Sequence, residues 1–535
     1  MKDLASDLLV DRLVDWGIDT VFGLPGDGAD GVERAFRRRA DRIRLVVVSH
    51  EEAAALMAAG YAKATGNVGV CLATSGPGAI RLLDGLYDAK LERQPVLAVT
   101  ELQENRLLGV AHPQELHLEK VFDDVADYNV RVDVPVQIPA VVDIAIGHSM
   151  ARGTVSHITF PHELPDTNEH SPWVVMAPAA TAATAPLFLP VPGVPPRDDL
   201  ERAAELLGGG ARVAVLAGLG ALGAREELLK VADTLASPIV KSLPGKPAVP
   251  DDHPLSSGCV GMFGTRPARQ ALEQADALLV VGTNFPYARH LPEPDRVRVV
   301  HLETDLGRVG PRTPRAMALI GDAQETLQAL LPLLDRAHDR SFLAAAQEAM
   351  RGWRAELAAV EDGGRTPVRP PYLARVVDRL AADDAILATD SGAVATWPAR
   401  HFDVRGGRRF LLSASLGSMA AGLPYAVAAQ WAYPECQCIA YVGSDGFAKL
   451  MGELLTAVHH RLPVKVVVNN TTAAARAGAA SAPPDFALWA EACGCLGLRV
   501  EKPHELEQAL ARALADPGPA LVDVLVNPEE APAPV

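Results

Sequence analysis

The sequence has few aromatic residues and no concentration of positive charge. Aromatic residues make up only 5% of its 535 residues, although 49% are hydrophobic, so Ala, Val and Leu carry most of the apolar character. This composition is typical of an α/β enzyme and excludes a disordered or fibrous chain. The formal net charge of -16 is spread along the chain without a basic stripe or a lysine-rich tail. A nucleic-acid partner is therefore not expected.

Signals for secretion and membrane insertion are also missing. The N-terminus lacks a basic-then-apolar signal pattern, so we expect a cytoplasmic location. The longest segment poor in charge, residues 172–196, carries seven prolines, which predicts an extended linker between domains and no membrane partner. Six cysteines include two Cys-x-Cys pairs, Cys436/Cys438 and Cys493/Cys495. Strand alternation or packing explains these pairs without zinc, and we expect reduced thiols.

The chain is too long for one core, and helices alternate with apolar strands over most of its length. We expect three α/β domains, at 1–170, 197–335 and 366–527, with a helical connector before the third. Strands such as "ALLVVGTNF" are apolar throughout, as in parallel sheets covered on both faces. Such open sheets bind ligands at the turns that follow their strands.

Two neighbouring stretches place chemistry at such turns. In "HEEAAALMAAGYAKATG" (50–66), Glu51 follows a buried strand and begins a helix. Taken alone, Glu51 is better explained by the preference of carboxylates for the first helical turn than by a functional role. In "TSGPGA" (74–79), a second strand runs into a Gly-Pro-Gly turn, which suits the close approach of a ligand to backbone amides.

These stretches resemble the thiamine diphosphate (ThDP) enzymes of the acetolactate synthase/pyruvate oxidase superfamily, and most closely the pyruvate oxidases. The resemblance extends over nearly the whole chain and includes "LPGDG" (24–28), "GTNFPY" (282–287) and "RRFLLSASLGSMAAGLPYAVAAQ" (408–430). It implies three doubly wound parallel-sheet domains: a pyrimidine-binding domain, a central FAD-binding-like domain and a diphosphate-binding domain. It also implies a homodimer or homotetramer in which the diphosphate site of one chain faces Glu51 of another.

The resemblance assigns roles to residues of the first domain. The glutamate matching Glu51 would exchange a proton with the pyrimidine of ThDP, which requires a carboxyl group in a dry pocket. Gln114 would lie close to the reacting groups. Arg81 stands where pyruvate oxidases carry a histidine, and its guanidinium suits the carboxylate of a substrate.

Residues of the third domain would hold the cofactor. Ser391 and Gly392 in "TDSGAV" would lie near the diphosphate, and the Gly417 carbonyl would accept from the aminopyrimidine. Met419 would hold the cofactor in its bent shape. Without the resemblance, Met419 is better explained as a core residue.

The central domain contains Gly-x-Gly-x-x-Gly at Gly218, Gly220 and Gly223, after a strand. No acidic residue ends the next strand, "PIVKSL", so the motif is a weak signal for NAD. The resemblance implies FAD instead, although related enzymes can keep this domain without a ligand. The candidate FAD contacts are Thr265, Asn284, Phe285, Asp305 and Asp322.

The magnesium motif of the family is displaced in this sequence. Ser444 stands where the family has its aspartate, and Asp445 follows one residue later; the strand "VKVVVNN" is also one residue short. A shift of one residue reverses a side chain in a strand, whereas a glycine turn can absorb it. Either Asp445, Asn470 and the Thr472 carbonyl bind Mg²⁺, as suits a hard cation, or the metal is lost.

The resemblance predicts ThDP- and Mg²⁺-dependent decarboxylation of pyruvate or a related 2-oxo acid, followed by oxidation through FAD or transfer of the acyl carbanion to an acceptor. The alternative is a degenerate relative that has lost ThDP and Mg²⁺, and either keeps FAD for other chemistry or acts as a non-catalytic partner. The displaced motif favours this alternative. So does "TTAAARAGAASAPPDF" (471–486), which skips about a dozen residues of the covering helix and cannot exclude water as a lid would.

Overall fold

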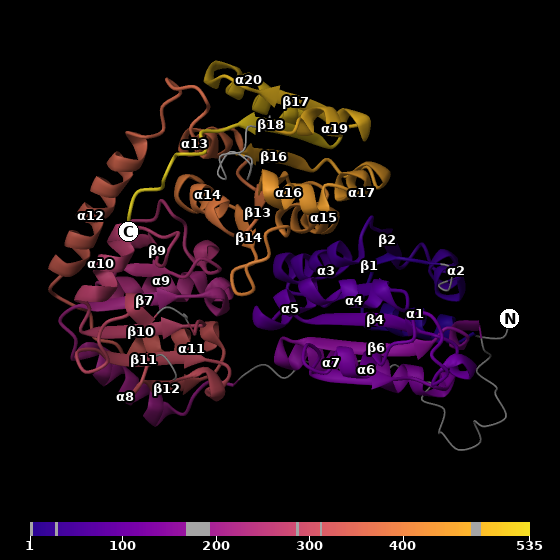
Figure 1. Ribbon diagram of the computed structural model, residues 1–535. Coiled ribbons are helices and arrows are strands. Elements are labelled where there is room, and N and C mark those ends of the chain that lie inside the picture. Colours follow the sequence, from indigo (N-terminus) through magenta and orange to yellow (C-terminus); the bar gives the residue numbers. More distant parts are fainter. Residues whose placement is uncertain (1–3, 27–29, 167–192, 285–287, 311–312, 472–482) are drawn as a thin grey trace.

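Three parallel sheets of six strands each, flanked by helices, make up the protein (Figure 1). The computed structural model describes residues 4–26, 30–166, 193–284, 288–310, 313–471 and 483–535. The sheets confirm the predicted α/β class, and one sheet falls within each of the three expected ranges. Among the described residues, no helix combines the length and apolar character needed to cross a membrane.

The N-terminal sheet has the strand order β2-β1-β3-β4-β6-β5. The order reverses between β1 and β3, so the turns after these two strands open a crevice at one edge. Helix α3 begins behind His50, whose side chain caps the Glu52 amide, and ends at Gly66 in the left-handed conformation. The elements of this domain are α1 (Ala5–Asp15), β1 (Thr20–Leu24), α2 (Asp30–Arg38), β2 (Arg44–Val47), α3 (Glu51–Thr65), β3 (Gly69–Ala73), α4 (Pro77–Arg81), α5 (Leu83–Leu91), β4 (Val96–Leu102), α6 (Leu118–Val121), β5 (Tyr128–Arg131), α7 (Ile138–Arg152) and β6 (Val155–Pro161).

The central sheet has the order β12-β11-β10-β7-β8-β9, and its reversal lies between β7 and β10. The Gly218 turn follows β7 and the Gly282 turn follows β10, so both glycine turns meet at this reversal. The elements of this domain are α8 (Arg197–Gly208), β7 (Val213–Ala217), α9 (Arg225–Thr234), β8 (Ile239–Lys241), β9 (Ser256–Cys259), α10 (Arg266–Gln274), β10 (Ala277–Val281), β11 (Arg298–Glu303), β12 (Met317–Ile320) and α11 (Ala323–Leu330).

The C-terminal sheet follows helix α12 (Ser341–Ala358), which runs along the outside of the central domain (Figure 1). Its order is β14-β13-β15-β16-β18-β17, with the reversal between β13 and β15. The elements of this domain are α13 (Pro370–Leu380), β13 (Ile386–Thr389), α14 (Thr396–His401), β14 (Arg409–Leu412), α15 (Gly422–Ala432), β15 (Cys438–Gly443), α16 (Ser444–Leu450), α17 (Glu453–His459), β16 (Lys465–Asn470), α19 (Phe486–Ala492), β17 (Leu496–Val500), α20 (Pro503–Ala515) and β18 (Ala520–Leu525).

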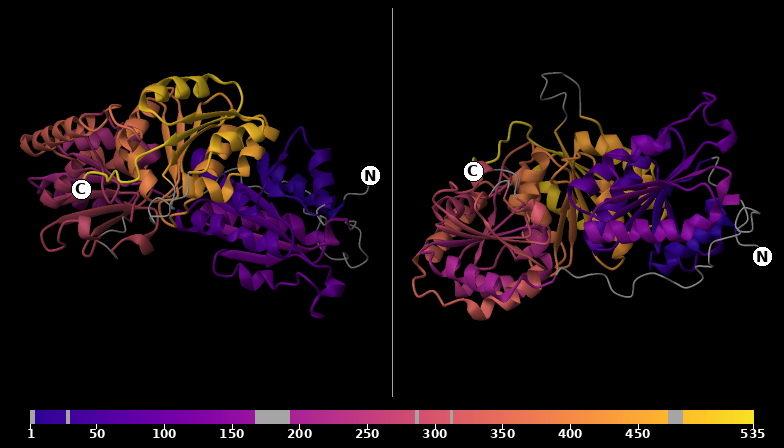
Figure 2. Two further views of the ribbon diagram at one scale, coloured as in Figure 1. Left: turned by 45° about the horizontal axis from the view of Figure 1, so that its top comes forward. Right: turned by 90° about the horizontal axis from the view of Figure 1, so that it is seen from below.

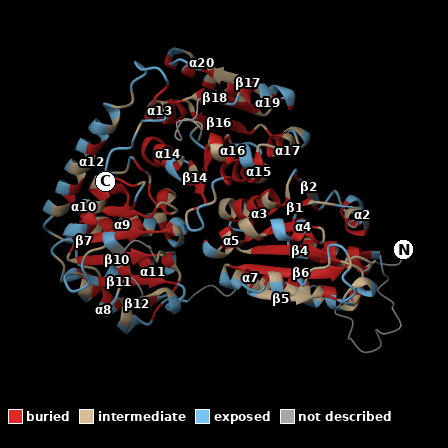
Figure 3. Ribbon diagram, viewed as in Figure 1, coloured by how far each residue is buried: buried red, intermediate tan, exposed pale blue. Residues whose placement is uncertain are grey.

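The C-terminal domain contacts both other domains and lies between them in two further views (Figure 2). Helix α3 of the N-terminal domain packs against α15, and the two helices belong to one continuous hydrophobic core. The central strands of the three sheets are buried, whereas edge strands such as β5 and β12 are partly exposed (Figure 3). The sheet edges that carry the glycine turns are therefore held at fixed positions relative to one another.

Candidate functional site

Three predicted residues gather at the turn between β3 and α4. Glu51 is the first residue of α3 and is 5% exposed, and its Oε2 lies 3.2 Å from Nη1 of Arg81. A Cβ atom on Gly78 would lie 3.0 Å from Oε1 of Glu51, and one on Gly76 would lie 2.8 Å from Cβ of Gln114. The Gly-Pro-Gly turn thus leaves room for both side chains.

A cavity of about 110 Å³ lies at the reversal of the C-terminal sheet. It is lined by Ser391 and Gly392 from the turn after β13, by Asp445 from α16, by Asn469 from β16 and by Met419. Met419 is 41% exposed in the chain, which contradicts its interpretation as a core residue. The structure therefore brings four predicted site residues, Ser391, Gly392, Met419 and Asp445, to one crevice.

Asp390 is the buried carboxyl group of this crevice. Its Oδ1 accepts a hydrogen bond from the Gly422 amide at 2.9 Å, and its Oδ2 accepts one from the Gly443 amide at 3.1 Å. Burial raises the pKa of Asp390 to about 8. A Cβ on Gly446 would lie 2.2 Å from Oδ2 of Asp390 and 2.0 Å from the Met419 carbonyl, so only glycine fits there. Asp390 thereby links the start of α15 to the end of β15.

The paired asparagines at the end of β16 lie in different surroundings. Asn469 lines the cavity, whereas Asn470 donates to Oδ1 of Asp523 at 2.8 Å and to the Pro484 carbonyl at 3.0 Å. The structure therefore places Asn469, and not the predicted Asn470, beside Asp445. The third predicted metal ligand, Thr472, lies outside the described residues.

Ser444, which replaces the aspartate of the family motif, is 4% exposed. Its Oγ has no hydrogen-bond partner within the described part of the chain, and the same holds for Oδ1 of Asn470. A buried oxygen without a partner is costly and suits a ligand or water. In residues 4–26, 30–166, 193–284, 288–310, 313–471 and 483–535, no three His, Cys, Asp or Glu side chains gather as a metal site. A cation here would therefore bind at most two of these side chains, together with amide, hydroxyl and carbonyl oxygens.

A larger cavity, of about 560 Å³, lies where the three domains meet. Its central-domain lining includes Gly220, Gly282 and Asn284, at the reversal between β7 and β10. A Cβ on Gly220 would lie 2.8 Å from Cα of Gly282, and a Cβ on Gly218 would lie 2.2 Å from Cβ of Thr283. These glycines let the two turns meet and leave an open crevice above them.

The C-terminal domain closes the other side of the larger cavity with residues 412–417. This loop is held by Glu92, whose Oε1 accepts from the Ser415 amide at 2.8 Å. Gly417 has φ 82°, a conformation that favours glycine. Ser391 and Gly392 line this cavity as well as the smaller one, so the two cavities adjoin.

The remaining FAD candidates have structural partners or lie elsewhere. Thr265 caps α10 and donates to the Ser257 carbonyl at 2.7 Å, and Asp322 caps α11. Asp305 pairs with Arg93 at 3.0 Å, and this hydrogen bond lowers the pKa of the carboxyl group. None of these three lines the larger cavity, and neither does Gly223. Phe285 lies outside the described residues.

Sequence reasoning missed Asp390, Asn469, Glu303 and Arg308, all of which line one of the two cavities. Asp390 had a usable signal, because it directly follows the buried strand β13 at the reversal of the sheet. Asn469 had one too, since adjacent strand residues face opposite sides. Glu303 lies in "LETD" (302–305), a stretch that the resemblance places around FAD, but the side chain itself was not singled out. Arg308 follows no motif.

Three parallel α/β sheets, with cavities at the reversals of the central and C-terminal sheets, define the fold class of the described residues. Family models of thiamine pyrophosphate enzymes, a synonym of ThDP enzymes, match the chain in three parts. The N-terminal TPP binding domain matches residues 4–126, the central domain 200–330 and the C-terminal TPP binding domain 390–524. The chain belongs to the thiamine pyrophosphate enzyme family.

Similar proteins cover almost the whole chain. YdaP of Bacillus subtilis, named as a thiamine pyrophosphate-containing protein, is 35% identical over 98% of this chain and 92% of its own length. The pyruvate oxidase of Lactiplantibacillus plantarum is 31% identical over 98% of this chain and 89% of its own. The chloroplastic acetolactate synthase of Arabidopsis thaliana is 28% identical over 98% of this chain and 82% of its own. These relatives confirm the resemblance to the superfamily.

Proposed function

We propose that this protein uses ThDP and Mg²⁺ to decarboxylate pyruvate or a related 2-oxo acid, and that FAD oxidises the product or an acceptor takes up the acyl group. The observation that carries the proposal is the shared lining of the two cavities by Ser391 and Gly392. A cofactor in the smaller cavity and a flavin in the larger one would be close neighbours. When bound, ThDP supplies the carbon nucleophile and the electron sink for decarboxylation.

The smaller cavity suits a diphosphate and its magnesium ion. Ser391 and Gly392 would approach the diphosphate, and the Asp445 carboxylate would be the charged ligand of Mg²⁺. The Asn469 amide oxygen and the unpartnered Ser444 hydroxyl would add neutral oxygen ligands from the same crevice. Asn470 and the Thr472 carbonyl remain candidates from the family spacing.

The larger cavity suits FAD. Its volume of about 560 Å³ is in the range of ligand pockets, and it combines glycine turns with a few polar side chains. Gly218 and Gly220 would let the flavin nucleotide approach the backbone, and Asn284 would contact it. Thr265, Asp305 and Asp322 would support FAD binding indirectly, by holding the turns around the cavity in place.

Proton transfer and binding of the substrate would take place at the turn between β3 and α4. Glu51 would exchange a proton with the pyrimidine, Arg81 would hold the substrate carboxylate, and Gln114 would border the reacting groups. These residues line neither cavity of their own chain. We therefore propose a homodimer or homotetramer in which each Glu51 serves the partner's cofactor.

A second candidate function is favoured by the Arg81–Glu51 ion pair of 3.2 Å. The pair joins the Glu51 carboxyl group to a neighbouring side chain, whereas proton exchange needs that carboxyl group to contact the pyrimidine. A chain whose pair persists with ligands bound would be a degenerate relative that keeps FAD for other chemistry or acts as a non-catalytic partner.

Release of carbon dioxide tests the first function directly. Purified protein supplied with ThDP, Mg²⁺ and pyruvate, or a panel of other 2-oxo acids, should release carbon dioxide. Glu51→Gln should lower the rate about 100-fold or more, whereas Glu52→Gln, the matched control, should retain it. No release from wild-type protein with any 2-oxo acid would contradict the proposal and favour the second candidate.

The absorption spectrum of the same sample tests the central domain. A flavin spectrum, present on purification or restored by added FAD, is expected. Gly220→Val should remove the flavin because its side chain would meet the backbone of Gly282. A preparation that cannot be reconstituted with FAD would contradict the flavin assignment.

A further inference from the structure

A third cavity, of about 280 Å³, lies between the central domain, α12 and α14. It shares no lining residue with the two cavities described above. Lys246, Asp251, Trp353, Arg400 and His401 are among the side chains that line it. A space of this size has room for several water molecules or one small ligand.

Two buried donors that line this cavity lack a hydrogen-bond partner. Trp353 is 2% exposed and Arg400 is 8% exposed. Within the described residues, neither Nε1 of Trp353 nor Nε of Arg400 finds an acceptor. The other Arg400 nitrogens donate only to carbonyls, those of Ala533 at 2.7 Å and Met262 at 3.4 Å. Unpartnered buried N–H groups are rare and point to a missing acceptor.

The carboxylates around the cavity already have partners; Glu361 and Asp403 both lie 3.5 Å from Arg375. Oδ1 of Asp251 lies 2.6 Å from Nζ of Lys241, and Oδ2 lies 2.6 Å from Nζ of Lys246. Glu361 is bonded to Nδ1 of His401 at 2.7 Å.

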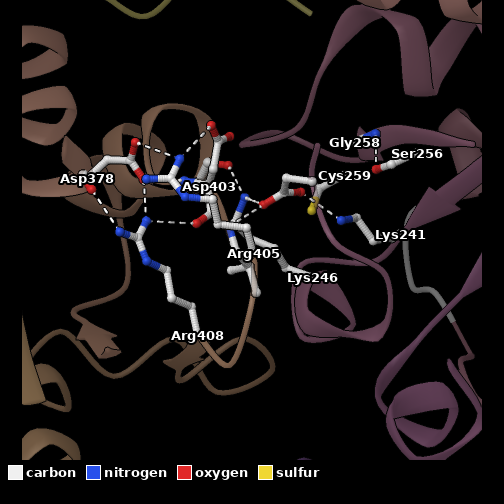
Figure 4. Close-up of polar contacts among 12 residues, drawn as sticks. Lys241, Lys246, Ser256, Gly258, Cys259, Asp378, Asp403, Arg405 and Arg408 are labelled. Atoms are coloured by element: carbon white, nitrogen blue, oxygen red, sulfur yellow. Dashed lines mark hydrogen bonds and ion pairs between the residues drawn. The ribbon is translucent and has the colours of Figure 1, made fainter. Parts of the chain in front are cut away.

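The same junction between the central and C-terminal domains holds further charged pairs. Asp378 pairs with Arg408 at 2.7 Å, and Figure 4 shows these side chains together with Lys241, Lys246 and Asp403. In the part of the chain that the structure describes, each acidic side chain that lines the cavity thus lies beside a basic side chain.

The guanidinium of Arg400 lies 5.7 Å from the centroid of the Trp353 ring, a cation–π contact, and has no carboxylate partner among the described residues. Across the described ranges it forms no ion pair, and burial lowers its pKa to about 10. Arg354, at the rim of the cavity, likewise donates only to the Asp251 carbonyl. A buried charge without a counterion is costly, so an anion here would relieve the cost.

We propose that this cavity binds a small oxyanion, a carboxylate or a phosphate group, which accepts hydrogen bonds from Trp353 and Arg400. Both donors are single N–H groups, and an anion with two oxygens can satisfy them together. The site is separate from the cofactor cavities, so the proposal does not depend on the proposed function.

Calorimetric titration of the full chain tests this site, with inorganic phosphate in one series and acetate in the other. We expect saturable binding of at least one anion, accompanied by a change in tryptophan fluorescence. Trp353→Phe removes the N–H with little change in shape, and Arg400→Lys keeps the charge without the Nε donor. Each should weaken binding about tenfold.

The control is Arg351→Lys, an exposed residue of α12 that pairs with Glu348, and it should bind as wild type does. Thermal unfolding verifies that each variant is folded. Binding of phosphate alone or of acetate alone identifies the class of ligand. Absence of saturable binding for both anions in wild-type protein would overturn the proposal. Binding by both variants with wild-type affinity would overturn it too, since that result places the anion elsewhere.

Discussion

Asn469 and Asn470 show how a shift of one residue changes which side chain lines the smaller cavity. The two residues are neighbours on β16 and face opposite sides of the strand. Asn469 shares the smaller cavity with Asp445, whereas the Asn470 amide donates to Asp523. If the cavity holds Mg²⁺ as proposed, Asn469 would therefore take the place that the family spacing gives to Asn470.

Substituting each asparagine separately tests this exchange. Asn469→Ala should weaken Mg²⁺-dependent ThDP binding about tenfold, because a ligand oxygen is lost. Asn470→Ala should lower the free energy of unfolding by about 1–3 kcal/mol, because Asp523 loses a buried donor. Calorimetry and denaturant unfolding measure the two effects. The reverse pattern would show that Asn470 is the ligand.

At this scale, the sequence predicts where a site lies better than which side chain serves it. The displaced Asp445 and the turn at Ser391 were found from motifs, and both line the smaller cavity. Thr265 and Asp322 cap helices, a role that the sequence could not separate from ligand binding because both roles place a polar residue after a strand.

Between elements, the packing of α3 against α15 fixes the N-terminal and C-terminal domains to each other. A Cβ on Gly60 would lie 2.7 Å from Cδ1 of Tyr425 and 3.0 Å from its Cα. Gly60→Ala should therefore lower the free energy of unfolding by about 1–3 kcal/mol through overpacking. Gly147→Ala on α7 is the control, since its nearest contact would be Trp16 at 3.9 Å. Denaturant midpoints compare the stability of the two variants. Equal midpoints would contradict the close approach of Gly60 to Tyr425.

Glu453, at the start of α17, joins α17 to the turn before α3. Its Oε2 accepts from Thr456 Oγ1 at 2.7 Å and from the Ser49 amide at 3.3 Å. Burial raises its pKa from 4.5 to about 7. Because the folded protein binds more protons than the unfolded chain between these values, this contribution to stability is present at low pH. It is lost as the pH rises through about 7.

Glu453→Gln keeps the acceptor and removes the titration. Relative to wild type, the variant should therefore gain about 2 kcal/mol in its free energy of unfolding between pH 5 and pH 8. Chemical denaturation at both pH values measures this difference. Glu435→Gln, an exposed control, should show no such change. If the free energy of unfolding of the variant differs from that of wild type by the same amount at both pH values, the shifted pKa of Glu453 would be contradicted.

For the whole molecule, function rests on residues that are far apart in the sequence. The larger cavity combines Arg93, Gly220, Asn284 and Gly417, which come from all three domains. Apolar strands and glycine turns predicted the three sheets, because those signals are local. The cavity was not predictable in the same way, since Leu91–Arg93 carries no motif and reaches the cavity only through domain packing.

Mixing two inactive variants tests the proposed sharing of sites between chains. Glu51→Gln and Asp445→Ala should each abolish carbon dioxide release. Co-expressed, they should restore about one quarter of wild-type activity, because half of the dimers are mixed and each contains one intact site. Activity after co-expression that stays at the level of the single variants would place Glu51 and Asp445 in the same chain's site.

The central claim is that the displaced motif still holds ThDP through a metal ion. Calorimetric titration of the protein with ThDP, with Mg²⁺ and again with a chelator, tests it most directly. We predict saturable binding that requires Mg²⁺ and is abolished in Asp445→Ala. Absence of binding in the presence of Mg²⁺, or binding that neither the chelator nor Asp445→Ala affects, would contradict the account.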